Sequence, residues 1–535
     1  MQKPPQLSCS MVSHDRRVLS FTCLLVLCAS FAARAEPLLP PVKRASELTK
    51  KGEMLGLEQK VDDASAAFEE ATALYEKLAD QNPSDATGCQ SLAACYEKFG
   101  DMLVGNNRLD RGLAAYQKSL EIRQSLANQD SENAERLHDV VQSLARMGRV
   151  SILHQQLSNS LQFYQKACIS GERLVKHNPE NYVWASEQAI NQDWVGEILL
   201  LLNSYDEAAD AYALIAETVK TLPDAANADL TWLAELAINL DDAAALIVSK
   251  GKPQQALRIF EVARDLRRQL VDRDSGNDEF IRDLAIGLEK IASLSIGRGE
   301  PLEALPVCQE AVDLLNEINA GRDNGSKAQL ALGYVLEQYG VAAEKLNRDD
   351  EALEHFQQSA TVLEKASTAL NTDAGVKQAL CRILSRFGSL LVTKHRYSDA
   401  LNAYQEVRNI LNVAYQANPT DATLGVALAV DLEAIGYVFS AEQMGTQALD
   451  SYKEASAIMT KLRQLHPENH ELDEAFAGTE LALGKLFRDQ GEAKDARGAF
   501  EQCSQILFQL QETGQLDDQG VSWLHEADMQ LRQPF

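Results

Sequence analysis

The sequence contains few residues that break a helix. Its 29 glycines and 14 prolines make up 43 of 535 residues, and β-branched residues form almost no runs. Ala, Leu, Glu, Gln and Asp recur instead at helical spacing. The composition therefore predicts an all-α chain.

Basic side chains are scarce as well. There are 51 Lys and Arg residues against 78 Asp and Glu residues, a formal net charge of -27. Nucleic acids and anionic membrane surfaces both require a cationic surface, so this charge disfavours both as partners. A basic protein or peptide is the easier electrostatic fit, and solubility alone is the alternative explanation for the charge.

The sequence lacks strong catalytic and cofactor motifs, such as a Gly-rich phosphate loop followed by Lys or the zinc-protease pattern His-Glu-x-x-His. Gly297 and Gly299 are not followed by a third glycine, so we expect a turn rather than a dinucleotide site. His466 and His470 have the spacing of a helical metal pair, but Pro467 between them predicts a solvated loop. We therefore predict no enzymatic activity, no cofactor and no metal.

One apolar run near the N-terminus has the marks of an export signal. Arg16 and Arg17 precede it, and Ala33 and Ala35 form a small-residue cleavage site at its end. We expect residues 1–35 to be removed, and the mature chain to be periplasmic or secreted. No other segment approaches the length of a membrane span, which predicts a soluble product without membrane insertion.

The chain repeats with a period of 48 residues. The clearest series is aromatic in nine of ten positions although aromatic residues make up 6% of the chain: Phe68, Tyr116, Tyr164, Tyr212, Phe260, Cys308, Phe356, Tyr404, Tyr452 and Phe500. Sixteen residues before each member stands a small residue: Gly52, Gly100, Gly148, Gly196, Ala244, Ala292, Gly340, Gly388, Gly436 and Gly484. A second small residue stands four residues before each member: Ala64, Gly112, Ser160, Ala208, Ala256, Ala304, Ala352, Ala400, Ala448 and Ala496.

These series predict an antiparallel helix pair in each repeat. Small residues at fixed points on two successive helices allow their backbones to approach, and the aromatic side chain fills the space beside them. A polar turn separates the two small series. The second helix ends at an Asn-Pro pair, which begins at Asn82, Asn178 or Asn418 in three of the repeats.

The order of small, small, aromatic and closing proline resembles the tetratricopeptide repeat over residues 44–515. This resemblance implies a right-handed superhelical solenoid of ten helix pairs that binds other proteins. The usual unit has about 34 residues, so we expect longer helices here and a deeper wall. Residues 36–43 are predicted to be a stiff linker, and residues 516–535 a capping helix over the last repeat.

Acidic residues recur on the first helix, three residues before the first small series. Six of the ten positions are acidic: Glu97, Asp193, Asp241, Glu289, Glu337 and Glu433. In the family that this chain resembles, this face lines a concave groove, so a ladder of carboxylates there would suit the Lys or Arg side chains of an extended or helical ligand. The alternative is an ordinary solvated helix face in an acidic protein.

The sixth repeat departs from the pattern of the others. Ala292 replaces glycine, Cys308 replaces the aromatic residue, and Pro306 falls within the second helix, which indicates either a degenerate repeat or a hinge.

The spacing of the cysteines argues against disulfide bonds. Cys89 and Cys95 lie on one predicted helix, about 9 Å apart along its axis and so beyond the reach of a disulfide. The remaining cysteines after residue 35 fall in four different repeats, so all six are predicted to be small core residues.

These features favour a non-enzymatic exported scaffold that holds other proteins. A structural or assembly subunit of a cell-envelope complex is the alternative. An enzyme or a small-ligand sensor would need a site assembled from separate repeats, for which the sequence offers no obvious polar cluster.

Overall fold

The computed structural model describes residues 40–220, 222, 230–321, 325–369 and 374–534. The predicted export signal, residues 1–35, lies outside this part of the chain. The described residues form helices and turns without a strand, as the composition predicts. The chain divides into two compact units, residues 1–122 and 123–535, and the division falls inside the fourth helix.

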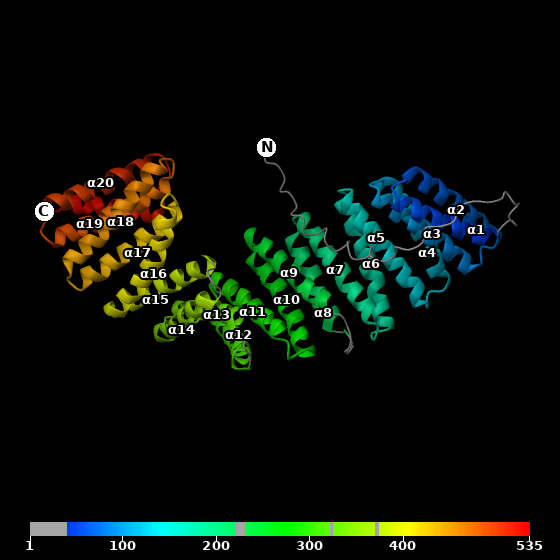
Figure 1. The fold of residues 1–535 in the computed structure, drawn as a ribbon, viewed down its shortest axis with the longest axis horizontal. Helices are drawn as coiled ribbons and strands as arrows, with labels where there is room; N and C mark the ends of the chain where they lie inside the picture. The colour runs from blue at the N-terminus through cyan, green and yellow to red at the C-terminus, as the bar shows by residue number, and fades with distance from the viewer. Residues whose placement is uncertain (1–39, 221, 223–229, 322–324, 370–373, 535) are drawn as a thin grey trace, which may run out of the picture. The chain divides into compact units, whose positions relative to one another are not determined.

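Helices alternate in a regular order along the chain (Figure 1). The first helices of the repeats are α1 (Pro41–Leu57), α3 (Ala86–Gly105), α5 (Ala134–Leu153), α7 (Tyr182–Leu201), α9 (Thr231–Ser249), α11 (Asp278–Gly297), α13 (Gly325–Lys345), α15 (Ala374–Thr393), α17 (Ala422–Ala441) and α19 (His470–Asp489). The second helices are α2 (Val61–Gln81), α4 (Leu109–Gln129), α6 (Leu157–His177), α8 (Tyr205–Lys220), α10 (Pro253–Arg273), α12 (Pro301–Gly321), α14 (Asp349–Ala369), α16 (Tyr397–Ala417), α18 (Gly445–Leu465) and α20 (Ala493–Glu512). A last helix, α21 (Asp518–Arg532), follows them.

The helix lengths account for the long period. First helices such as α5 have 20 residues and second helices such as α6 have 21, so the extra residues are shared between both helices as predicted. From α5 onward each helix contacts the next helix along the chain, except that α8 contacts mainly α10 among the helices that follow it, and in the first unit α2 contacts both α1 and α3. The handedness of the solenoid stays a prediction.

The turn inside each repeat has the same backbone conformation. One residue, nine before the aromatic position, adopts a positive φ in all ten repeats: Gln59, Asn107, Gln155, Asn203, Gly251, Gly299, Asn347, His395, Gln443 and Gly491. The backbone N–H groups after the helix donate to its last free carbonyls, as when Gln156 N donates to Ser151 O at 2.8 Å. This is the left-handed cap that commonly ends a helix, and Gly299 belongs to it as the expected turn residue.

The turn between repeats is fixed by side-chain caps. Asp85, Asn133, Asn181, Asp421 and Asn469 each precede a first helix and accept a hydrogen bond from a backbone N–H in its first turn. The second helices before them end where the Asn-Pro breakers predict, α2 at Gln81 and α16 at Ala417. The sequence therefore predicted the helix ends correctly at these turns.

A close contact between glycine and an aromatic ring holds the two helices of a pair together. A Cβ atom added to Gly340 would lie 2.6 Å from the ring of Phe356, and one added to Gly148 would lie 2.5 Å from the ring of Tyr164. Phe356 is fully buried and Tyr164 nearly so. Both small series and the aromatic series thus form the contact that the 48-residue pattern predicts.

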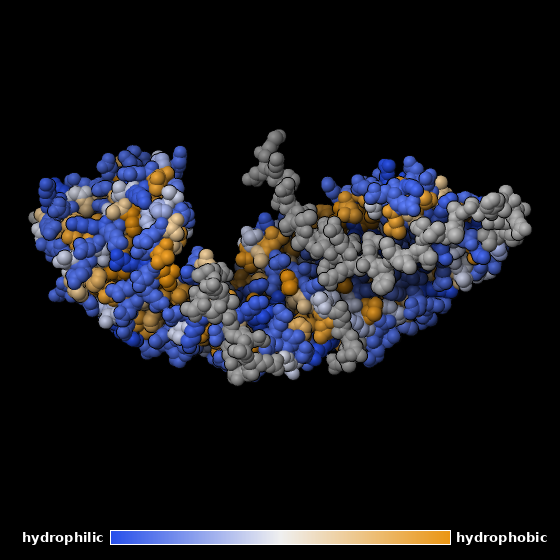
Figure 2. Space-filling view, viewed as in Figure 1, coloured by the Kyte–Doolittle hydropathy of each residue, from blue (hydrophilic) through white to orange (hydrophobic). Residues whose placement is uncertain are grey.

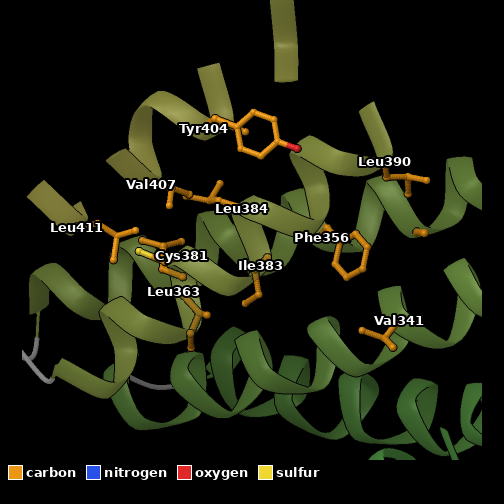
Figure 3. Close-up of a cluster of buried hydrophobic side chains, with 14 of the residues drawn as sticks. Val341, Phe356, Leu363, Cys381, Ile383, Leu384, Leu390, Tyr404, Val407 and Leu411 are labelled. Carbon is orange, nitrogen blue, oxygen red and sulfur yellow. The ribbon is translucent and has the colours of Figure 1, made fainter. Parts of the chain in front are cut away.

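The core of the second unit continues between repeats through aliphatic side chains. Figure 3 shows Phe356 and Tyr404, the aromatic residues of successive repeats, with Cys381 among Leu384 and Leu411. The six described cysteines are free, and Cys95, Cys308, Cys381 and Cys503 are buried as predicted for core residues, while Cys89 and Cys168 are half-buried.

Repeat six keeps the helix pair despite its irregular sequence. α12 runs unbroken through Pro306. Cys308 and Ala292 are both fully buried. Alanine also replaces glycine in repeat five, where Ala244 and the aromatic Phe260 are both buried. Whether the repeat acts as a hinge stays a prediction.

Both ends of the repeat array differ slightly from the predicted boundaries. α1 begins at Pro41, inside the expected linker, because proline is well suited to the first position of a helix. α21 packs on α19 and α20 in the place expected for the capping helix, with Ala527 fully buried and Leu524 nearly so.

One described helix contradicts the expectation about membrane-spanning length. α17 is long and apolar enough to cross a membrane by length and composition alone. It carries Asp431 and Glu433 in its centre and packs against α16, α18 and α19. Apolar residues such as Leu428 and Leu432 form part of the core, whereas Val430 is exposed.

The glycine contact makes a direct prediction about stability. Gly340→Ala places a methyl group against the buried ring of Phe356 and should destabilise the fold by about 1–3 kcal/mol. Gly498→Ala in α20 has no neighbouring atom within 4 Å. It should stabilise the fold by about 0.5–1 kcal/mol, because alanine is the better helix former. Urea unfolding followed by circular dichroism measures both, and a loss of stability in Gly498→Ala as large as in Gly340→Ala would refute the assignment.

Candidate functional site

The six acidic residues predicted to form a ladder lie mostly inside the molecule. Three of them are buried, with at most 8% of their surface exposed: Asp193, Asp241 and Glu337. The other three are half-buried: Glu97, Glu289 and Glu433. None is exposed, so neither an open row of carboxylates nor a solvated helix face describes them. The expectation of a solvated face is therefore wrong, and a protein-binding groove at these residues stays a prediction.

In the second unit, each ladder carboxylate accepts a hydrogen bond from the first helix of the next repeat. Asn239 Nδ2 donates to Asp193 Oδ2 at 3.4 Å, and Lys290 Nζ donates to Asp241 Oδ2 at 2.6 Å. Each donor lies between 45 and 49 residues beyond its acceptor. The remaining pairs follow the same rule: Gln338 with Glu289, Arg382 with Glu337, and Thr479 with Glu433.

The same spacing occurs in the first unit with uncharged groups. Thr49, which occupies the ladder position in the first repeat, lies 3.3 Å from the Sγ atom of Cys95 on α3, with both residues buried. The position is therefore a contact between first helices whether or not it is acidic. We conclude that the ladder residues form structural contacts between the first helices of successive repeats.

Two of the carboxylates are neutralised by cations. Asp241 lies between Lys290 and the buried guanidinium of Arg267, which donates to both of its oxygens at 3.2 and 2.6 Å. Glu337 accepts two hydrogen bonds of 2.6 Å from Arg382. A bidentate pair of this kind fixes the orientation of both side chains.

The other carboxylates in the second unit have neutral donors. Burial raises the pKa of Asp193, Glu289 and Glu433 to about 7, and the charges of Glu197 and Glu337 add to the effect for Asp193 and Glu289. Asp431, two residues before Glu433, has no hydrogen-bond partner on either oxygen, and burial raises its pKa to about 8. These groups lose a proton near neutral pH rather than near pH 4.

An apolar stripe, which the sequence reasoning missed, lies three residues before the ladder on the first helices. It consists of one residue per repeat at 48-residue steps: Ile190, Ile238, Ile286, Tyr334 and, after Arg382, Val430. Ile190, Ile238 and Val430 are 40%, 55% and 54% exposed, and the other two are half-buried. The hydrogen bonds of the ladder hold these helices side by side, so the stripe runs across neighbouring repeats.

The face of the molecule drawn in Figure 2 is mainly hydrophilic, with scattered hydrophobic patches. The 48-residue period could have revealed the stripe, since Ile recurs at 190, 238 and 286 at positions that belong to neither small series nor the aromatic series. Neighbouring exposed apolar side chains, such as Ile190 and Ile238, are typical of an interaction site.

The residues considered for metal or cofactor chemistry do not come together. Among the described residues, no group of three or more His, Cys, Asp or Glu side chains has the arrangement of a metal site. His466 follows the end of α18, and its Nε2 lies 2.8 Å from the carbonyl oxygen of Thr420, whereas His470 begins α19 beside Asp473.

Solved structures resemble this chain, whereas sequence comparisons find no match. No family model and no curated protein matches the chain. Among the solved structures, BtubC from P. vanneervenii is 15% identical with a TM-score of 0.36, covering 48% of this chain and 92% of that chain. The apo form of RapI is 13% identical with a TM-score of 0.36, covering 80% and 100%. A signal transduction ATPase with a tetratricopeptide repeat sensor from Pyrococcus horikoshii is 11% identical with a TM-score of 0.35, covering 92% and 72%.

The described part of the chain fits a tetratricopeptide-like fold on its own geometry. Paired helices, a small-to-aromatic contact within each pair and side-by-side first helices are all present. The long helices, the buried ladder and the exposed apolar stripe are features of this chain.

The two kinds of ladder contact should respond differently to mutation. Asp241→Asn leaves the buried Arg267 without its counter-charge and should destabilise the fold by about 3–5 kcal/mol. Glu433→Gln keeps an oxygen that accepts from Thr479 and should change stability by less than about 1 kcal/mol. Urea unfolding at pH 7.5 compares the two variants, and similar losses in both would contradict the distinction between charged and neutral contacts.

The raised pKa values predict that stability falls as the pH rises towards 8. Asp193, Glu289, Asp431 and Glu433 keep their protons in the folded chain to a higher pH than in the unfolded chain, where such groups titrate near about 4. Between these values the folded state binds more protons, so their stabilising contribution is present at low pH and is lost as the pH rises through 7 to 8.

Thermal unfolding between pH 6 and 8 tests this expectation. The midpoint should decrease with rising pH in the unmodified chain. It should depend less on pH when Asp431→Asn and Glu433→Gln are combined, because those side chains no longer titrate. A slope that the two substitutions leave unchanged would show that other groups control the dependence.

Proposed function

We propose that this chain is a non-enzymatic exported scaffold that binds segments of other proteins along the apolar stripe of its first helices. The observation that supports this proposal is that exposed apolar residues recur at one position of repeats four, five and nine, as Ile190, Ile238 and Val430. The residues at the ladder are occupied by contacts within the chain, which leaves the stripe as the recurring exposed feature of these helices.

The chemistry of the stripe favours a segment with apolar side chains at regular intervals. Neighbouring first helices present one apolar side chain each, so a bound segment in extended or helical form would place its own apolar residues against several repeats. The net charge of -27 supports a partner that also carries basic residues, since opposite charge favours encounter. The export signal predicted for residues 1–35 supports a partner in the periplasm or outside the cell.

An assembly role in a cell envelope remains as the second function, supported by the exposed end of the array. Phe508 on the outer face of α20 is 52% exposed, and it lines a shallow pocket together with Leu531 of α21. This apolar end surface would suit contact with another subunit.

Peptide binding tests the scaffold function against a matched control. Peptides selected from a random displayed library on the chain from residue 36 should bind about tenfold or more weakly to an Ile190→Ser and Ile238→Ser variant, because apolar anchors carry most of the affinity at such sites. The control variant, Ile169→Ser with Leu214→Ser, removes apolar side chains that are 64% and 56% exposed from the second helices α6 and α8.

The two variants distinguish specific binding at the stripe from non-specific binding to exposed apolar side chains. The control should keep the affinity of the unmodified chain, and circular dichroism should show both variants folded. Equal losses in the two variants, or a library that yields no binding peptide, would refute binding along the stripe.

A further inference from the structure

One face of α1 is built for stacking between repeats but has no neighbour among the described residues. In most later repeats the first helix packs on the second helix that precedes it, as α3 does on α2 and α7 on α6. No described helix precedes α1, which packs on α2 and α3. The side of α1 that would receive a preceding second helix is therefore open in the described part of the chain.

The 48-residue period identifies the residues of this open face. Arg44 stands at a position that is buried in all nine later repeats, as Leu92 is in α3. Met54 is 63% exposed, whereas its equivalent Met102 in α3 is 8% exposed. Lys51 stands where the later repeats have an apolar residue, buried in eight of nine: Phe99, Met147, Val195, Ala243, Ile291, Tyr339, Phe387, Ile435 and Leu483.

The centre of the open face carries two exposed charges of opposite sign. Glu47 and Lys51 lie one turn apart on α1, and both are exposed. Neither takes part in an ion pair with another described residue, whereas Arg44 pairs with Glu70 of α2 at 2.5 Å. Glu47 and Lys51 are therefore available to a partner that presents both signs of charge.

The order of charges along α1 is complementary to itself in an antiparallel arrangement. Lys43 lies near the start of the helix and Glu58 directly follows its end. When a second copy of α1 lies across this face in the opposite direction, Lys43 lies opposite Glu58, and Glu47 lies opposite Lys51. A two-fold axis forms each of these pairs twice. A parallel arrangement would place like charges opposite each other and align the two helix dipoles unfavourably.

Solubility alone does not account for the composition of α1. The end of a repeat array needs a polar outer face to remain soluble, and the charged residues meet that need. Met54 does not, since it lies 63% exposed on the same face, and Leu57 near the end of the helix is 72% exposed. Exposed apolar residues surrounded by charged ones are typical of a contact surface.

We propose that two copies of this chain associate through α1, packed antiparallel about a two-fold axis, with Glu47 of each copy paired to Lys51 of the other. Met54 supplies the apolar contact beside these pairs. Because both copies use the same face, the association ends at a dimer. The inference is independent of the proposed function, since it involves α1 and not the apolar stripe.

Sedimentation velocity of the chain from residue 36 tests the pairing by charge exchange. The unmodified chain should change from monomer to dimer as its concentration rises. Glu47→Lys and Lys51→Glu should each weaken the dimer by about tenfold or more, because each places like charges opposite each other twice. An equal mixture of the two variants should regain the affinity of the unmodified chain, since every contact between them again joins opposite charges.

A matched pair of residues on α6 controls for the change of charge. Glu172 and Lys176 are also exposed, one turn apart on their helix, and pair with each other. Glu172→Lys and Lys176→Glu should each leave the dimer unchanged. Thermal unfolding shows whether all four variants remain folded.

Three results would overturn the inference. A chain that stays monomeric at every concentration would mean that the face of α1 does not bind a second copy and is open to another protein. A dimer that neither α1 substitution weakens, or that the control substitutions weaken equally, would mean that association uses a different surface or general charge attraction. Variants that lose the dimer separately and do not regain it in the mixture would show that Glu47 and Lys51 do not lie opposite each other.

Discussion

The contact between a small residue on one helix and a buried aromatic ring on the next is the constraint on which the rest of the structure depends. Because the ring of Phe356 fills the space that a side chain at Gly340 would need, the two helices can pack in only one register. The 48-residue period repeats this contact without insertion. Equivalent residues of successive first helices are therefore brought to equivalent places, whatever their chemistry.

Because the positions are equivalent, the same contact between first helices can be formed by charged pairs in some repeats and by uncharged partners in others. Thr49 with Cys95, Asp193 with Asn239, and Glu337 with Arg382 occupy the same junction between repeats. Packing fixes the distance between helices, and the side chains at the junction then supply hydrogen bonds suited to that distance. A buried carboxylate costs free energy unless it is paired. The junction therefore fixes the spacing of the helices in every repeat, whereas its contribution to the free energy of folding depends on how the carboxylate is paired.

The sequence predicted the parts of the fold that depend on local chemistry. Small residues, an aromatic residue and Asn-Pro breakers determine the helix pairs and their ends, and these were predicted correctly. The direction of the ladder side chains was not, because period alone does not reveal which side of a first helix faces its neighbour. Residues three apart on a helix lie about 60° apart around its axis. That rotation separates the buried Asp241 from the exposed Ile238.

The two positions have different surroundings, since the ladder is buried or half-buried and the stripe includes exposed residues. The ladder residues form hydrogen bonds within the chain, so substitutions there act through stability, while the exposed Ile190, Ile238 and Val430 can change with little cost to packing. The α7–α9 junction differs because Asn239 is an uncharged donor that occupies a single oxygen of Asp193. Where the next repeat supplies Lys290 to Asp241, the carboxylate is neutralised from within.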